Sequence, residues 1–367
     1  MGRPLVAEIN LKALRHNYQL AQQQSASDQA IAVIKADGYG HGAVQVARAL
    51  ADLVPGFAVA SLEEAEQLTA AGITQPILLL EGFFSADELP LLIRRGYDLV
   101  VHSQWQLDIL NLYFAGNPAS EGQPQLQVWL KVDSGMHRLG FDPEQVSGVF
   151  HHLIQQSWIK DVILTSHFAC ADNLDSPFTF QQLEIMQQLQ KQLKCTVSLA
   201  NSPATLGWPS ACEGWLRPGI LLYGASPLPK GHLLGDQLQA VMTLKSQLIS
   251  VRTIKAGEQV GYGGRFIAHK TTPIGVVACG YGDGYPRQAI DGTPIIVNGI
   301  KCALAGRVSM DMLTVDLTPV PDAQPGDSVE LWGPNLKVNE VADYCDTISY
   351  TLLTGLLPRV KRHYFSF

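Results

Sequence analysis

The sequence predicts a (β/α)8 TIM-type barrel followed by a C-terminal mainly-β domain. Up to about residue 225, short β-rich runs alternate with longer amphipathic stretches, as in parallel strands joined by helices. After about residue 235, short alternating runs separated by turn pairs replace this pattern. The 367 residues also exceed the ~100–200 residues of one domain. We therefore expect a barrel over residues 1–231 and a β domain over residues 232–367.

The number of β-rich runs in the first part distinguishes a barrel from other parallel sheets. Eight runs alternate with helical stretches, and eight parallel strands close a barrel. A doubly wound open sheet is the alternative, but the fingerprint G-x-G-x-x-G at a first strand is missing. The expected strands are Ile31–Lys35, Phe57–Ser61, Ile77–Glu81, Leu99–His102, Leu126–Val132, Val162–His167, Val197–Ala200 and Trp215–Arg217.

The remaining elements follow from periodicity and turn chemistry. Apolar residues at three-to-four spacing predict helices over Ala43–Leu53 and Phe180–Leu193. Asn298-Gly299 lies between two apolar runs and predicts a hairpin, because both residues tolerate positive φ. Pro and Gly within residues 226–231 mark the boundary, and residues 3–9 could form a strand of the β domain. The strands expected in that domain are Met242–Ile254, Pro273–Cys279, Ile295–Leu304, Met312–Leu317 and Ser328–Leu331.

Composition and charge exclude several classes of protein. The chain has 26 Lys and Arg against 33 Asp and Glu, a net charge of −7, whereas nucleic-acid and anionic-membrane binders show a basic face. No apolar run approaches the ~20 residues needed to cross a bilayer, and the N-terminus does not resemble a signal peptide. The six cysteines are scattered without a C-x-x-C pair, which indicates free thiols rather than disulfides or a metal site. We expect a cytoplasmic protein.

Polar side chains follow the expected barrel strands at their carboxyl ends. Active sites of such barrels lie at this face, and a group of this kind is hard to explain by packing. We therefore expect a catalytic site here. Its candidates by position are Lys35, His102, Lys131, Asp133, His167, Asn201, Ser202 and Arg217.

The segment from Ala32 to Gly42 is the most informative part of the sequence. Lys35 closes an apolar strand at the mouth of the barrel, where partial desolvation can lower the pKa of its amine and make it nucleophilic. The small residues and glycines that follow allow a bulky planar group to approach the backbone. Spacing alone leaves an ordinary lysine at the barrel rim open as the alternative.

This segment resembles the attachment motif for pyridoxal 5′-phosphate (PLP) in alanine racemases. The resemblance continues in the family's order over the whole chain and both expected domains. It includes departures at Asp37-Gly38, where many members have Asn-Ala, and at Thr351, where an acidic residue is common. The other similar blocks are residues 129–140, 166–172, 200–202, 217–224, 260–263, 280–287, 306–311 and 348–350.

The resemblance implies a racemase that interconverts L-alanine and D-alanine with two bases. Lys35 would bond covalently to PLP and act on one side of the substrate, and Tyr262 of the partner subunit would act on the other. His167 would hydrogen-bond that tyrosine and would itself be backed by Arg217. Arg217 would face the pyridine nitrogen, where other PLP enzymes place a carboxylate, and would suppress transamination. Because the two bases of one site would come from different subunits, the resemblance also implies a homodimer.

The resemblance also implies roles for the surrounding residues. The phosphate would be bound by Tyr39, Tyr350 and Ser202 together with the backbone amides of Gly219 and Ile220. Arg138 and the Met310 amide of the partner subunit would bind the substrate carboxylate, and a carbamylated Lys131 would orient Arg138. The supporting and access positions are Asp311, Asn201, Tyr281, Arg287, Arg307 and Ile348. No metal is implied.

Three other readings remain as alternatives. A broad-specificity racemase of the same fold commonly has an export signal and disulfide pairs, which this sequence lacks. A PLP-dependent amino-acid decarboxylase uses a carboxylate and a cysteine where this chain has Arg217 and Tyr262. A non-catalytic PLP-binding protein resembles the isolated barrel without the β domain. The residues do not separate a role in D-alanine supply for peptidoglycan from one in L-alanine catabolism.

Overall fold

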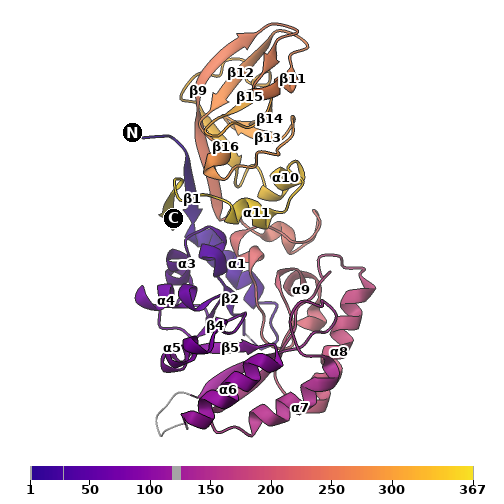
Figure 1. Cartoon of the computed structure of the whole chain (residues 1–367). Coiled ribbons are helices and arrows are strands. Elements are labelled where there is room, and N and C mark those ends of the chain that lie inside the picture. The colour runs from indigo at the N-terminus through magenta and orange to yellow at the C-terminus, as the bar shows by residue number, and fades with distance from the viewer. Residues whose placement is uncertain (1, 28, 118–124, 367) are drawn as a thin grey trace.

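The computed structural model describes residues 2–27, 29–117 and 125–366, and its first half is a parallel barrel (Figure 1). Neighbouring strands pair in the order of the chain, so the connection between each pair crosses over through a helix. The strands are β2 (Ala32–Val33), β3 (Phe57–Val59), β4 (Ile77–Leu79), β5 (Asp98–Val101), β6 (Leu126–Lys131), β7 (Ile159–Thr165) and β8 (Val197–Ser198).

The segment Trp215–Arg217 closes the ring between the last strand and the first. On one side the Leu216 amide donates to the Gln29 carbonyl at 2.8 Å, and the Ile31 amide donates back to Leu216 at 3.0 Å. On the other side the Trp215 amide donates to the Val197 carbonyl in β8, and the Arg217 amide donates to the Ala200 carbonyl just beyond β8. The predicted barrel is therefore confirmed, although its eighth segment is a bridge too short to count as a strand.

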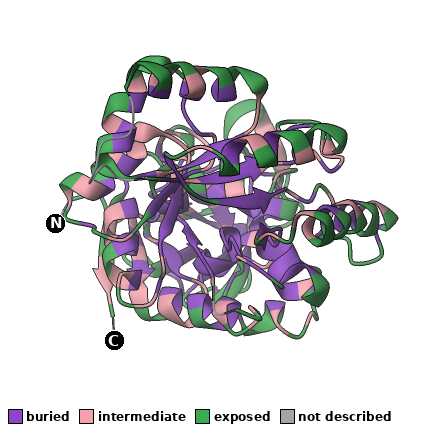
Figure 2. Ribbon diagram, turned by 90° about the horizontal axis from the view of Figure 1, so that it is seen from below, coloured by how far each residue is buried: buried purple, intermediate pink, exposed green. Residues whose placement is uncertain are grey.

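Helices surround these strands and cover them with their apolar faces (Figure 2). The strands are buried on both sides, which explains why they are almost continuously apolar in the sequence. Several helices begin at a side-chain cap; for example, Ser103 accepts a hydrogen bond from the Gln106 amide. The main helices are α1 (Leu11–Gln22), α3 (Ala43–Leu50), α4 (Leu62–Ala70), α5 (Leu89–Arg95), α6 (Gln104–Gly116), α7 (Pro143–Ile154), α8 (Pro177–Leu193) and α9 (Ser202–Gly207).

The second half is an eight-stranded sheet in the order β12-β15-β14-β13-β16-β9-β1-β17. Because β12 also pairs with the 13-residue strand β9, part of this sheet closes on itself. The hairpin predicted at Asn298-Gly299 is present, with Val297 opposite Ile300. The strands of this half are β9 (Met242–Ile254), β12 (Thr272–Val277), β13 (Pro294–Val297), β14 (Ile300–Leu304), β15 (Leu313–Asp316) and β16 (Ser328–Trp332).

The two ends of the chain lie side by side on this sheet. β1 (Val6–Asn10) pairs antiparallel with β9 and parallel with β17 (Lys361–Phe365). Several elements of this half were not predicted from the sequence, namely β17, the short pair β10 (Gln259–Val260) and β11 (Phe266–Ile267), and the helices. Those helices are α10 (Val338–Asp343) and α11 (Ser349–Thr354).

Helix α11 packs against α2 (Lys35–Tyr39), which brings the C-terminal part of the chain to the mouth of the barrel. All six cysteines are free thiols. None of the described helices combines the length and the apolar character that a membrane span requires.

Candidate active site

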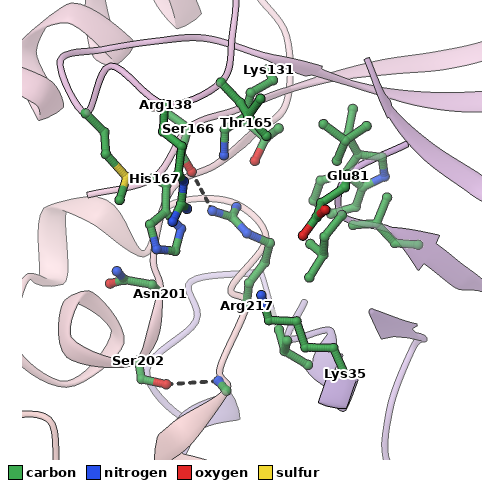
Figure 3. Close-up of a pocket in the computed structure, with 18 of the residues that line it drawn as sticks. Lys35, Glu81, Lys131, Arg138, Thr165, Ser166, His167, Asn201, Ser202 and Arg217 are labelled. Carbon is green, nitrogen blue, oxygen red and sulfur yellow. Dashed lines mark hydrogen bonds between the residues drawn. The ribbon is translucent and has the colours of Figure 1, made fainter. Parts of the chain in front are cut away.

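A cavity of about 570 Å³ opens at the carboxyl ends of the barrel strands. Most of the polar residues that the sequence placed at this face line it (Figure 3). Tyr350 from α11 lines it as well. The sequence-selected residues found here are Lys35, Tyr39, Lys131, Asp133, Arg138, His167, Asn201, Ser202, Arg217, Gly219, Ile220 and Tyr350. His102, also selected by its position at a strand end, does not line the cavity.

Lys35 begins a left-handed turn rather than ending a strand, which corrects the expected bounds of the first strand. β2 ends at Val33, and Ala36, Asp37 and Tyr39 have φ angles of 51°, 53° and 51°. Non-glycine residues adopt this region rarely and at a cost in free energy. The Glu64 carboxylate stabilises the turn, because its two oxygens accept the Ala36 amide at 2.7 Å and the Ala60 amide at 2.8 Å.

Arg217 is buried in the cavity wall, and its donors are directed at backbone groups of neighbouring strand ends. Nη1 donates to the Ser198 carbonyl at 2.7 Å and to the Ser198 hydroxyl, and Nη2 donates to the Ser166 carbonyl at 2.5 Å (Figure 3). Burial lowers the pKa of the guanidinium to about 10, so it keeps its positive charge at neutral pH.

The cavity is strongly cationic. Burial, followed by the charges of Arg217, Arg138 and Lys35, lowers the pKa of Lys131 to about 7. Burial, followed by the positive charges of Lys131, Arg217, Arg138 and Lys35, holds the pKa of His167 well below its usual value. Such a clustering of positive charge in a partly closed cavity attracts anions.

One end of the cavity is shaped for an anion with several oxygens. The Ser202 hydroxyl accepts hydrogen bonds from the Gly219 amide at 2.9 Å and the Leu221 amide at 3.3 Å. A Cβ added at Gly219 would lie 2.6 Å from the Tyr39 hydroxyl, so only glycine leaves this space open. The segment after Pro218 forms a four-residue 3-10 turn, Ile220–Tyr223.

These residues fit PLP, which combines a phosphate with an aldehyde. Hydroxyl groups of Tyr39, Ser202 and Tyr350 and the neighbouring amides surround the space suited to the phosphate, while Lys35 supplies an amine at the same cavity. Aromatic rings form a rigid wall here. The stacked rings of Tyr39 and Tyr223 have centroids 4.9 Å apart, and the centroids of the Tyr39 and Tyr350 rings are 5.9 Å apart.

The remaining candidates lie outside this cavity. Tyr262 is 70% exposed in the turn after β10, Met310 is 54% exposed between β14 and β15, and Ile348 is 59% exposed before α11. None of the residues selected from the second half except Tyr350 lines the described cavity of the same chain. Those outside it are Tyr262, Tyr281, Arg287, Arg307, Met310, Asp311 and Ile348.

The structure also adds residues that the sequence analysis did not select. Glu81 lines the cavity and is the last residue of an expected strand, so its position at a strand end was an available signal. Gln182 of α8 is fully buried and donates to the His167 carbonyl at 3.0 Å while accepting the Ala169 amide at 3.0 Å. Nothing in its helical sequence context indicated this role.

This combination of a (β/α)8 barrel, a β domain and a lysine in a cationic cavity is typical of a barrel enzyme that uses an anionic cofactor. The family described as "Alanine racemase, N-terminal domain" matches residues 9–227, and "Alanine racemase, C-terminal domain" matches residues 241–364. The chain therefore belongs to the alanine racemase family.

Individual relatives agree over nearly their whole length. The chain is 53% identical to an alanine racemase of Chromohalobacter salexigens, over 99% of this chain and 98% of that protein. It is 52% identical to a catabolic alanine racemase of Pseudomonas aeruginosa, over 98% of this chain and 99% of that protein.

Solved structures give the same result. The biosynthetic alanine racemase of P. aeruginosa matches with a TM-score of 0.92 and 48% identity, over 99% of each chain. The alanine racemase of Bartonella henselae, solved with covalently bound pyridoxal phosphate, matches with a TM-score of 0.89 and 30% identity, over 99% of each chain.

Proposed function

We propose that this chain interconverts L-alanine and D-alanine with PLP bound to Lys35. The observation that most supports this function is the placement of Lys35 and the buried cation Arg217 in one anion-binding cavity. When bound, PLP withdraws electrons from the substrate Cα and makes its proton acidic. Lys35 would hold the cofactor until the substrate amine replaces it, and the released Nζ would then remove or return the proton on one side of Cα.

Arg217 limits the chemistry to racemisation. A guanidinium only donates hydrogen bonds and keeps its charge, so it disfavours a second positive charge on the ring nitrogen that it faces in the family's arrangement. With weaker electron withdrawal, the proton returns to Cα rather than to the cofactor. The bonds from Arg217 to Ser198 and Ser166 fix the guanidinium in place.

The cofactor phosphate is bound at the end of the cavity formed by Ser202 and the residues around it. Tyr39, Ser202 and Tyr350 would contribute hydroxyl groups, and Gly219 and Ile220 would contribute backbone amides, with the Gly219 amide exchanging its hydrogen bond to the Ser202 hydroxyl for one to the phosphate. Asn201 supports this region as the N-cap of α9, where its side chain accepts the Ala204 amide at 3.2 Å.

The second base is Tyr262 of the partner subunit in a homodimer. A phenol has an unperturbed pKa of about 10 and is a poor base at neutral pH, so it needs cationic or hydrogen-bonding neighbours. His167 is held neutral and can accept a hydrogen bond from that phenol, next to Arg217 and Lys131. The exposure of Tyr262, Met310 and Ile348 supports a second copy covering these residues.

The substrate carboxylate binds Arg138 and the Met310 amide of the partner subunit, with Asp311 in support. Tyr281, Arg287, Arg307 and Ile348 line the access corridor to this site. We also propose a cytoplasmic location and a domain boundary near residue 231, between the two family matches.

Cofactor attachment and activity test this proposal together. The purified protein should absorb in the visible region, and borohydride should remove this band while adding the cofactor mass to the peptide that contains Lys35. The same protein should convert L-alanine to a racemic mixture, and Lys35→Ala should lack both properties. Attachment at another lysine, or undiminished racemisation by Lys35→Ala, would contradict the proposal.

A further inference from the structure

Asp283 is a fully buried carboxylate held by two arginines from opposite ends of the chain. Arg3 contacts both of its oxygens, with Nη2 at 2.7 Å from Oδ2, and Arg359 donates through Nε at 2.6 Å to Oδ1. The Gly280 amide donates to Oδ2 at 2.8 Å. Asp283 thus joins the N-terminal segment to the segment that precedes β17.

The same two arginines also bind the turn that contains Met310. Arg3 Nη2 donates to the Asp311 carbonyl at 2.5 Å. Arg359 Nη2 donates to Asp311 Oδ1 at 2.7 Å and contacts the Met310 carbonyl at 3.4 Å. We call residues 309–311 the Met310 turn. Each arginine therefore links Asp283 to this turn.

The backbone around Asp283 lies against the Met310 turn as well. The Tyr281 amide donates to the Ser309 carbonyl at 3.0 Å, and the Gly282 amide donates to the Met310 carbonyl at 2.8 Å. A Cβ at Gly280 would lie 2.3 Å from the Ser309 carbonyl oxygen, so the two segments approach as closely as glycine permits. The carbonyl side of the turn is fully occupied, whereas the Met310 amide donates to no acceptor within the described residues.

Asp283 keeps its negative charge in this setting. Burial by itself would raise the pKa of the carboxyl, but the hydrogen bonds from Arg3 and Arg359 outweigh it and place the pKa below its usual value. Removing this charge would leave two guanidinium groups facing each other around an uncharged centre, which is unfavourable in a buried site.

We propose that Asp283 is a positioning residue that, through Arg3 and Arg359, fixes the Met310 turn so that its free amide points to the substrate carboxylate. This inference rests on the proposed function, in which that amide serves the partner subunit's cavity. It also gives the N-terminal segment a part in substrate binding, although Arg3 does not line the described cavity.

Two variants of the full-length holoenzyme test the proposal. Asp283→Asn keeps the shape of the side chain but removes its charge. Arg3→Ala removes one of the two arginines that connect Asp283 to the Met310 turn, and the Arg3 side chain is partly exposed and not required for the core. Both should raise the KM for L-alanine about tenfold, corresponding to about 1.4 kcal/mol, with little change in kcat. The inhibition constant of propionate, which has the carboxylate of alanine but no amine, should rise in parallel.

Amide hydrogen exchange provides a readout that does not depend on turnover. Exchange should become faster at residues 309–312 in both variants, with the visible absorbance of the cofactor unchanged. Arg15→Ala is the matched control, because Arg15 forms a similar two-nitrogen pair with Asp52 on the barrel surface. It should leave KM, propionate inhibition and exchange at residues 309–312 unaltered.

Unchanged KM, propionate inhibition and exchange in Arg3→Ala would overturn the inference, even if Asp283→Asn did not fold. A parallel fall in kcat and cofactor binding, without a selective rise in KM, would assign Asp283 to general stability and would also overturn it. Absence of racemisation in the unmodified protein would instead refute the proposed function.

Discussion

At the scale of single residues, burial and neighbouring cations give Lys131 a pKa far below that of an ordinary lysine. Its pKa of about 7 leaves roughly half of the amine neutral at pH 7, and only the neutral amine can react with carbon dioxide. We predict a carbamate on Lys131, whose negative charge would orient the Arg138 guanidinium. Carbon-13 NMR of protein kept in labelled bicarbonate should show one carbamate carbonyl, which weakens as the pH falls below 7.

The matched control for this prediction is Lys131→Arg, which keeps a positive side chain that cannot form the carbamate. Its spectrum should lack the carbamate signal. A signal that persists in Lys131→Arg would assign the modification to another lysine, and no signal in the unmodified protein would contradict the prediction.

His41 should make the stability of the protein depend on pH. Its ring is fully buried on Tyr223, and Nδ1 lies 2.9 Å from the Tyr39 carbonyl, to which it donates, while Nε2 has no partner in the described part of the chain. Burial lowers the pKa of His41 to about 4. The unfolded chain takes up this proton near pH 6.5. The contribution of neutral, buried His41 to the unfolding free energy is therefore fully present above that pH and is lost as the pH falls towards 4. The loss amounts to roughly 3 kcal/mol.

Urea unfolding between pH 7 and pH 4 measures this dependence. His41→Phe retains a ring on Tyr223 but cannot titrate, so its unfolding free energy should fall less steeply with acid. The exposed residue His151 provides the control variant His151→Gln, which should retain the steep fall. An equally steep fall in His41→Phe would assign the acid sensitivity to other groups.

At the scale of elements, the left-handed turn after Lys35 depends on helix α4. Glu64→Ala would leave the Ala36 and Ala60 amides without their acceptor, which costs about 1–3 kcal/mol of unfolding free energy. Because the turn positions Lys35, cofactor retention should also weaken. Denaturant unfolding and dialysis of the holoenzyme would measure the two effects.

Glu63→Ala is the control for this prediction, because Glu63 is exposed in the same first turn of α4 and shares the helix-dipole contribution of under about 1 kcal/mol. Equal losses in the two variants would show that the helix, rather than the contact with the turn, is responsible.

The elements that could be predicted from sequence were those with a long or regular signal. Buried parallel strands such as β6 and the Asn298-Gly299 hairpin depend on local apolar runs and on turn residues, which the sequence displays. The turn at Ala36–Tyr39 could not be predicted, because its left-handed conformation depends on Glu64, a distant residue. β17 is polar and partly exposed, so only its pairing with β1 makes it a strand.

The same distinction applies to the candidate site. Strand ends predicted Lys35, His167 and Arg217 by position, because parallel strands place their carboxyl ends at one face. Tyr262 and Met310 have no such signal, since each lies in a turn of the β domain away from the cavity. Only the family resemblance indicated them, and their place in catalysis remains a proposal that depends on a second chain.

At the scale of the whole molecule, this dependence leads to a prediction about mixed dimers. If Lys35 and Tyr262 of the partner subunit form one site, a dimer of a Lys35→Ala chain and a Tyr262→Ala chain contains one intact site and one doubly defective site. Random reassembly of the two inactive proteins should therefore restore about a quarter of the unmodified activity. Mixing Lys35→Ala with His167→Ala is the control, because both residues lie in the cavity of one chain and every mixed site would lack one of them. No recovery in the first mixture would mean that each chain contains its own complete pair of bases. Equal recovery in both mixtures would mean that the gain does not come from a site shared between Lys35 and Tyr262.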